Sequence, residues 1–195
     1  MIDIQEVHLK SNYLIDNLEK ASESEVYQSL PTYERSKNSR VALQAGTGLG
    51  KTTLAMHTAQ LFLEQGAKHV IIAFPKIMIG KNKADENWEM LFDGKTYGVS
   101  DYPKTILCTY DNLYLIPESV LKNSVVWLDE LHEFATSSFR PKLKIVINKL
   151  FALCPYIIGM SGTISHLVFQ EEFSIFLKIK EKEPIRRVLH DVVLL

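Results

Sequence analysis

Short apolar runs alternate with longer mixed segments along most of the chain. Uninterrupted apolar runs of this length predict strands that are buried on both faces, and they fall at residues 41–45, 69–74, 105–109, 125–128 and 156–160. Residues 52–65 and 143–153 have helical spacing, and Gly66 stands where a helix C-cap is expected. The alternation predicts an α/β fold of three layers, in which helices cover both faces of a central, mainly parallel sheet.

Other segments have a weaker pattern. Apolar residues in 7–21 recur at helical spacing, and the polar stretch 79–103 predicts a loop with a short helix near 86–92. Toward the end of the chain we expect a helix over about 166–176 and a strand over about 187–194.

Composition adds few constraints. Among 195 residues, 46% are hydrophobic and 23% are charged, as in ordinary globular domains, and a net charge of −1 gives no overall attraction to nucleic acid. Cys108 and Cys154 lie in apolar runs without metal-ligand spacing, and Trp88 and Trp127 are expected in the core. No apolar run reaches about 18 residues and no signal peptide is evident, so we expect a cytoplasmic or otherwise intracellular protein without a membrane partner.

The run AGTGLGKT has the form of a phosphate-binding loop, and it joins a predicted strand to a predicted helix. Its glycines allow main-chain N–H groups to approach a triphosphate, Lys51 reaches the β and γ phosphates, and the Thr52 hydroxyl binds Mg²⁺. The nucleotide-binding residues predicted here are Ala45, Gly46, Thr47, Gly48, Leu49, Gly50, Lys51, Thr52 and Thr53.

A second run, DELH, follows the predicted strand 125–128. Asp129 is placed to hold the magnesium shell, and Glu130 to orient or deprotonate the attacking water. The alternative is a glycine-rich turn and two solvated acids, but it explains neither the Lys51–Thr52 pair nor the occurrence of both runs at strand ends. The two runs therefore predict a nucleoside triphosphatase.

Together with Ser161-Gly162-Thr163, these runs resemble motifs I, II and III of superfamily-two helicases and translocases, in the DExH-box group. Residues 69–76 resemble motif Ia and residues 106–113 resemble motif Ib. The resemblance implies a RecA-like core that binds ATP with Mg²⁺ and moves along DNA or RNA.

The resemblance also implies a role for particular residues. The expected catalytic residues are Lys51, Asp129, Glu130 and His132; the Mg²⁺ ligands are Thr52 and Asp129; the nucleic-acid contacts are Pro75, Lys76, Thr109 and Tyr110; and Ser161 and Thr163 couple the sites. His132 is either the link from the γ-phosphate site to Ser161 and Thr163 or a structural histidine. Lys81 and Lys83 extend the basic group near Lys76 or are solvated loop residues. Gln28 lies where related proteins read adenine, but its surroundings favour a plain surface glutamine.

Helicases of this type have two RecA-like lobes, and nothing after Thr163 resembles the second. We therefore expect an N-terminal helical extension over 1–38, a RecA-like ATP-binding lobe over 39–180, and over 181–195 the start of a linker to a second lobe. The alternatives are a P-loop ATPase of another class, such as a loader or a partition-type switch, and a non-enzymatic adaptor. Intact Lys51 and Glu130 argue against the adaptor.

Overall fold

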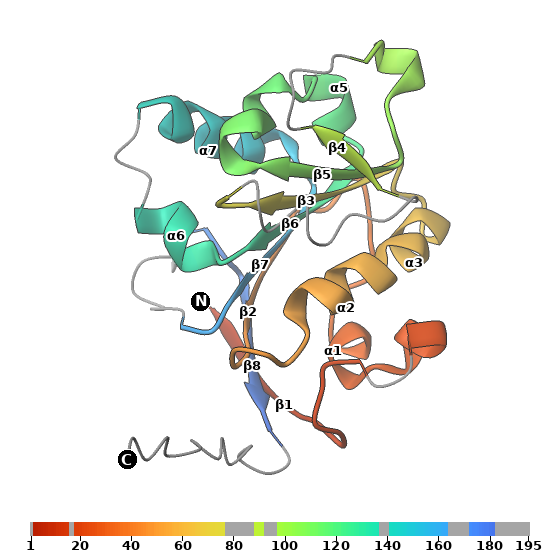
Figure 1. Cartoon of the computed structure of the whole chain (residues 1–195), viewed down its shortest axis with the longest axis vertical. Coiled ribbons are helices and arrows are strands. Elements are labelled where there is room, and N and C mark those ends of the chain that lie inside the picture. The colour runs from red at the N-terminus through yellow and green to blue at the C-terminus, as the bar shows by residue number, and fades with distance from the viewer. Residues whose placement is uncertain are drawn as a thin grey trace, which may run out of the picture.

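The structure, a computed structural model, describes residues 2–15, 18–76, 88–91, 97–136, 141–163 and 172–181. Within these ranges, eight strands form one sheet in which all neighbouring strands are parallel. Helices lie on both faces of the sheet (Figure 1). The predicted three-layer α/β architecture is therefore confirmed.

The order of the strands in the sheet differs from their order along the chain. In sheet order, the strands are β1 (Asp3–His8), β8 (Ile175–Lys180), β2 (Ser39–Gln44), β7 (Tyr156–Ser161), β6 (Ser124–Asp129), β3 (His69–Phe74), β5 (Thr105–Thr109) and β4 (Glu89–Leu91). The α-helices are α1 (Glu25–Gln28), α2 (Lys51–His57), α3 (Ala59–Glu64), α5 (Glu118–Leu121), α6 (Leu131–Thr136) and α7 (Pro141–Leu153). The 3₁₀ helices are η1 (Leu18–Glu23), η2 (Val99–Asp101) and η3 (Tyr110–Leu115).

Each face of the sheet has its own hydrophobic core. One core joins alternate strand residues, such as Val125 and Trp127, to α1, α2 and α3. The other joins the intervening residues, such as Val126 and Leu128, to η3, α5, α6 and α7. Because both faces are covered, all six residues of β6 are buried. This explains why the central strands are uninterrupted apolar runs in the sequence.

The predicted helix 52–65 is divided into α2 and α3 at Thr58. The Thr58 hydroxyl donates a hydrogen bond of 2.7 Å to the Leu54 carbonyl, and a hydroxyl bonded in this way bends a helix. At the end of α3, Gly66 has a φ of 102°, and the N–H groups of Gly66 and Ala67 bond to the carbonyls of Leu63 and Phe62. This is a Schellman motif, so the predicted glycine C-cap is confirmed.

Two predicted helices are wrong where the structure describes them, and the helical pattern over residues 7–21 is confirmed only in part. Val7 and His8 end the edge strand β1 (Asp3–His8), paired in parallel with β8, whereas residues 18–21 lie in η1. Glu89–Leu91, inside the predicted helix 86–92, is the edge strand β4, paired with β5. The predicted helix 166–176 ends in the first residues of β8 (Ile175–Lys180), whereas residues 166–171 lie outside the described residues. In all three places, pairing with a distant strand overrides a weak local pattern.

The predicted boundaries of the three domains stay predictions, since the predicted strand 187–194 and most of the predicted linker also lie outside the described residues.

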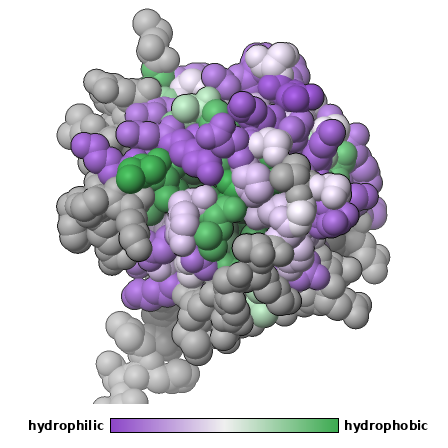
Figure 2. Space-filling view, turned by 90° about the horizontal axis from the view of Figure 1, so that it is seen from above, coloured by the Kyte–Doolittle hydropathy of each residue, from purple (hydrophilic) through white to green (hydrophobic). Residues whose placement is uncertain are grey.

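The two cysteines and the two tryptophans are buried, as predicted: Cys108, Cys154, Trp88 and Trp127. Figure 2 shows the face seen from above, where hydrophilic side chains predominate and hydrophobic ones are confined to smaller areas.

Candidate nucleotide-binding site

The phosphate loop connects the end of β2 to the start of α2. Gly48 and Gly50 both have a φ of 85°, a left-handed conformation that glycine adopts without the penalty of a Cβ atom. Leu49, between them, is buried, and its carbonyl accepts a hydrogen bond of 3.0 Å from the N–H of Leu14. The loop is therefore anchored to the N-terminal segment as well as to the sheet.

Lys51 is the first residue of α2 and is only 7% exposed. Its ammonium Nζ donates to the carbonyls of Ala45 and Gly46, at 3.1 Å each. The positive charge is thus held against the loop by neutral acceptors. A phosphate oxygen carries more negative charge than a carbonyl, so it would compete well for these donors.

Thr52 and Asp129 join the loop to the acidic run. The Thr52 hydroxyl donates to Asp129 Oδ2 at 2.8 Å, although the residues belong to α2 and β6. Burial raises the pKa of the Asp129 carboxyl above its usual value, and the charge of Glu130 raises it further, whereas the Thr52 hydrogen bond and Lys51 lower it. A cation beside this carboxylate would offset the cost of burying its charge.

The same pair fits a magnesium ion. Mg²⁺ prefers hard oxygen ligands and usually takes only one or two from the protein, together with waters and phosphate oxygens. The Thr52 hydroxyl and the Asp129 carboxylate are such ligands, and both line the pocket beside the phosphate loop.

Glu130 directly follows β6 and has a φ of 56°. Within the described part of the chain, it is the only non-glycine residue with positive φ. Its N–H bonds to Asp129 Oδ1 at 3.1 Å, and its side chain lines the pocket. A non-glycine residue in this region is strained unless its surroundings hold it, and such residues cluster at functional sites.

Gly159 of β7 allows α6 to lie close to the sheet. A Cβ atom at Gly159 would come within 2.4 Å of Cδ2 of Leu131, the fully buried first residue of α6. The close contact fixes the start of α6, and therefore the positions of Glu130 and His132 on either side of Leu131.

His132 connects the acids to the end of β7. Its Nδ1 lies 2.7 Å from Ser161 Oγ and 3.4 Å from Glu130 Oε2. The Ser161 hydroxyl donates to the Thr163 carbonyl at 3.1 Å, which leaves its oxygen free to accept a hydrogen from Nδ1 of His132. His132 and the two residues predicted to couple the sites, Ser161 and Thr163, thus form one hydrogen-bonded chain.

These elements enclose a pocket of about 420 Å³. Residues of the phosphate loop line it together with Asp129 and Glu130, and Tyr13 and Ile15 join them from the segment between β1 and η1. Tyr13 and Ile15 were not predicted to belong to the site, because nothing in their local pattern connects them to the loop. The hydrogen bond from Leu14 to Leu49 makes that connection.

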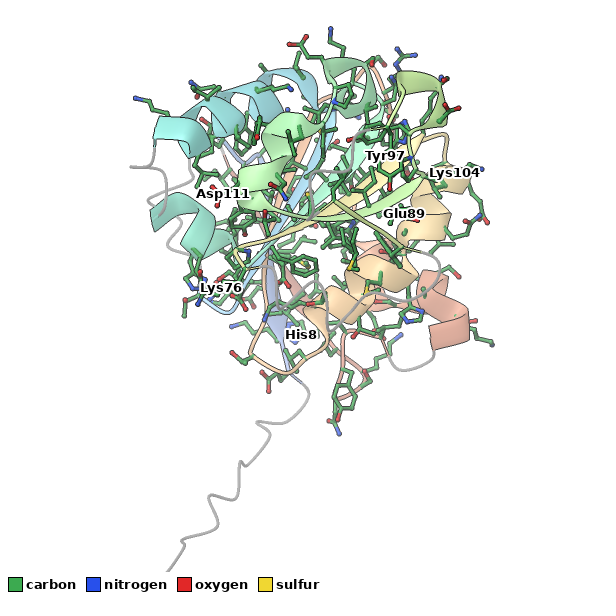
Figure 3. All side chains as sticks on the ribbon, turned by 45° about the horizontal axis from the view of Figure 1, so that its top comes forward. His8, Lys76, Glu89, Tyr97, Lys104 and Asp111 are labelled. Carbon is green, nitrogen blue, oxygen red and sulfur yellow. The ribbon has the colours of Figure 1, made fainter. Side chains whose placement is uncertain are left out.

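The predicted nucleic-acid contacts lie at the ends of β3 and β5. Lys76 is exposed, and Pro75 and Thr109 are half-buried; Figure 3 shows Lys76 near the strand ends. Tyr110 is only 4% exposed, and its hydroxyl donates to the main-chain carbonyl of Asp129. The Tyr110 hydroxyl is therefore turned into the protein, and contact of this residue with nucleic acid stays a prediction.

Three further predicted residues lie elsewhere. Gln28 is exposed, its amide donates to the Ser22 carbonyl at 3.3 Å, and it is not among the residues that line the pocket. This agrees with the interpretation of Gln28 as a surface glutamine. Lys81 and Lys83 lie outside the described residues.

The fold and the pocket define an ATP-binding, RecA-like lobe. The chain belongs to the family described as "Type III restriction enzyme, res subunit", whose sequence profile matches residues 6–166. The resemblance to the first lobe of superfamily-two helicases is thereby confirmed. Comparison with curated protein sequences gives no match.

Solved structures with a similar fold include three helicase-related proteins. The UvsW helicase of bacteriophage T4 is 16% identical, with a TM-score of 0.55 over 71% of this chain and 54% of that chain. The SWI2/SNF2 ATPase core of Sulfolobus solfataricus in complex with dsDNA is 18% identical, with a TM-score of 0.56 over 79% and 34%. A hypothetical ATP-dependent RNA helicase from Sulfolobus tokodaii is 17% identical, with a TM-score of 0.52 over 82% and 56%.

The chain spans between 34% and 56% of the length of these three structures. At such identities the likeness establishes the fold alone. In the described part of the chain, no helix has both the length and the apolar character needed to cross a membrane.

Proposed function

We propose that this chain is the ATP-binding lobe of a DExH-box helicase or translocase, which couples hydrolysis of Mg-ATP to movement along, or unwinding of, DNA or RNA. One observation carries the proposal. The hydrogen bond of 2.8 Å between Thr52 and Asp129 brings the phosphate loop and the DELH run into one pocket. Loop and acids in this arrangement suit phosphoryl transfer to water.

Each polar residue of the pocket has a role in this reaction. The Lys51 ammonium would exchange the Ala45 and Gly46 carbonyls for phosphate oxygens, and Thr52 and Asp129 would hold Mg²⁺. Glu130 takes a proton from the water whose oxygen forms the new bond to the γ-phosphorus, while the bond to the bridging oxygen breaks and ADP leaves.

His132 is suited to report the state of this site. Because its Nδ1 lies within 3.4 Å of Glu130 and 2.7 Å of Ser161, a change at Glu130 alters a hydrogen-bonded chain that ends at Thr163. We assign His132, Ser161 and Thr163 to coupling between ATP and the rest of the helicase.

The apolar residues that line the pocket are suited to bind the nucleobase. Tyr13 is 53% exposed, so its ring is available for stacking, and Ile15 also lines the pocket. A base that stacks on Tyr13 would place its triphosphate toward the loop, since both line one pocket.

The nucleic-acid strand is proposed to run along the ends of β3 and β5. Lys76 supplies a positive charge, and Thr109 supplies a hydroxyl, which are suited to phosphates rather than to bases. The Sulfolobus solfataricus ATPase core was solved with dsDNA, which makes duplex DNA the first ligand to test.

The test is phosphate release from Mg-ATP with and without DNA or RNA, in the chain and in its Glu130→Gln variant. Glutamine keeps the shape of Glu130 but cannot take a proton, so we expect ATP affinity to remain and turnover to fall by about 10²–10⁴-fold. Lys51→Ala is the control that loses binding itself. Wild-type turnover in Glu130→Gln would show that DELH is not the catalytic run, and turnover unaffected by nucleic acid would favour another class of P-loop ATPase.

A further inference from the structure

Tyr110 connects the end of β5 to the main chain of β6, although these two strands are not neighbours in the sheet. It directly follows β5, whereas the carbonyl that accepts its hydroxyl belongs to Asp129 at the end of β6. In the sheet, β3 lies between β5 and β6. Phe74 pairs with Thr109, and Ala73 pairs with Leu128, so Asp129 is level with Thr109 at a separation of two strand spacings, about 10 Å.

The hydrogen bond from the Tyr110 hydroxyl to the Asp129 carbonyl holds the peptide unit between Asp129 and Glu130. That unit consists of the Asp129 carbonyl, which Tyr110 binds, and the Glu130 N–H, which bonds to Asp129 Oδ1 at 3.1 Å. Both polar ends of the unit are therefore fixed. Since φ of Glu130 is 56°, the unit is held in an orientation that a glutamate does not adopt by itself. The orientation of this unit sets the direction of the Glu130 side chain.

Tyr110 is well placed to act as a fixed donor. Tyr110 is only 4% exposed, and its hydroxyl donates to the Asp129 carbonyl inside the protein. The helix η3 that Tyr110 begins is held from two sides. The Asn112 amide donates to the Leu91 carbonyl at 2.6 Å, and Lys149 Nζ donates to the Ile116 carbonyl at 2.8 Å.

The strand ends next to Tyr110 are those proposed above to bind nucleic acid. Lys76 follows β3, and Thr109 immediately precedes Tyr110; Figure 3 shows Lys76 and Asp111, the neighbour of Tyr110, on the same side of the molecule. A nucleic-acid strand that moved the end of β5 would move the Tyr110 hydroxyl with it, and the peptide unit of Glu130 would follow.

We propose that Tyr110 is a positioning residue for Glu130, and that it transmits the position of the β5 strand end to the proposed catalytic acid. The inference rests on the proposed function, since it assigns a route by which nucleic acid reaches the ATP site. Tyr110 does not line the nucleotide pocket, so it acts on Glu130 through the main chain.

The test compares Tyr110→Phe with Tyr156→Phe in the full chain. Both substitutions remove a buried tyrosine hydroxyl that donates to a main-chain carbonyl, because Tyr156 donates to Pro31 at 2.6 Å. Tyr156 begins β7, about 16 Å from the end of that strand at Ser161. The two variants should therefore lose similar thermal stability, while only Tyr110→Phe should disturb Glu130.

Two readouts separate positioning from a merely structural role. In steady-state phosphate release at saturating Mg-ATP, Tyr110→Phe should lower kcat by about 10- to 100-fold with little change in ATP affinity, and Tyr156→Phe should leave kcat unchanged. In ¹⁵N spectra, the Glu130 amide should shift and exchange faster in Tyr110→Phe alone. A duplex DNA oligonucleotide should shift this amide in the wild type and not in Tyr110→Phe.

The outcomes distinguish this inference from the proposed function. A kcat equal to that of the wild type in Tyr110→Phe, or an equal loss in both variants, overturns the positioning role. An oligonucleotide shift that persists in Tyr110→Phe overturns the transmission. If the wild type releases no phosphate and binds no oligonucleotide, the proposed function fails, and an unchanged Glu130 amide in Tyr110→Phe would then overturn the structural assignment separately.

Discussion

Tyr13 supplies the aromatic surface of the nucleotide pocket, and its substitution tests the proposed base position. Stacking of a base on an aromatic ring contributes about 1–3 kcal/mol, so Tyr13→Ala should weaken Mg-ATP binding by about 5- to 150-fold in calorimetry. Inorganic triphosphate has no base, so its affinity should be the same in both proteins. The matched control is Tyr114→Ala, because Tyr114 is also 53% exposed but does not line the pocket. An equal loss for ATP and triphosphate would show that Tyr13 acts through the loop instead.

Asp129 is a residue whose burial opposes stability. Its pKa is raised in the folded protein, whereas in the unfolded chain it titrates near the usual value of about 3.9. Below that pH, the Asp129 carboxyl is protonated in both the folded and the unfolded state, so its burial costs no charge desolvation. As the pH rises, the unfolded state ionises first, so the wild type loses stability relative to a neutral variant.

Asp129→Asn should therefore raise the melting temperature at pH 7, and this gain should shrink as the pH falls toward about 3. Asn keeps an acceptor for the Thr52 hydroxyl. The control is Asp101→Asn at an exposed position. A gain that stays constant from pH 3 to pH 7, in thermal unfolding without nucleotide, would argue against a charge effect.

The polar residues of the site were predictable, whereas the apolar ones were not. The loop residues and the two acids follow each other along the chain, and their spacing carries the chemistry. Tyr13 reaches the site only because a segment distant in sequence is bonded to Leu49. The bond from the Tyr110 hydroxyl to the Asp129 carbonyl was not predictable, because the end of a strand does not reveal to which side the next side chain turns.

At the scale of secondary structure, the packing of α6 against β7 depends on Gly159. In Gly159→Ala the new Cβ atom would lie within 2.4 Å of the buried Leu131 side chain, so the helix has to move. Overpacking of this kind costs about 1–3 kcal/mol of stability. Because α6 begins directly after Glu130, we also expect a fall in ATP turnover, measured alongside thermal unfolding.

Shortening Leu131 to alanine in the Gly159→Ala variant should remove the clash and restore the position of α6. Leu131→Ala alone leaves a cavity and costs about 2–5 kcal/mol, but in the double variant the Gly159→Ala methyl group fills part of that space. The two substitutions should therefore be less destabilising together than the sum of each alone. Additive losses would mean that Gly159 and Leu131 do not depend on each other for the position of α6.

The central strands were predictable from sequence, and the edge strands were not. A strand in the middle of a covered parallel sheet is apolar on both faces, so β3, β5, β6 and β7 appear as continuous apolar runs. In β1 the burial pattern leaves only Val7 buried, and β4 has three residues. Such strands owe their conformation to a partner, as β1 does to β8 from the other end of the chain.

Across the whole molecule, the residues of the proposed reaction lie at or just after the carboxyl ends of the parallel strands. Gln44 pairs with Ser161, and Asp129 pairs with Met160, so the phosphate loop, the acids and the coupling serine leave neighbouring strands at the same level. The carboxyl ends of β3 and β5 continue this row of strand ends beyond β6. Such a row of strand ends forms one side of a ligand-binding cleft, and a second lobe could form the other side.

The last prediction concerns activity of the 195-residue chain by itself. We expect it to bind ATP weakly, to hydrolyse it slowly and not to separate a duplex. In comparable enzymes, an arginine supplied from outside the phosphate loop contributes about 10³–10⁵ in rate, and no arginine lines the described pocket. The measurement is strand displacement on a labelled duplex with Mg-ATP, beside phosphate release under the same conditions. Robust unwinding by this chain would mean that one lobe suffices, and that the arginine comes from this chain or from a second copy of it.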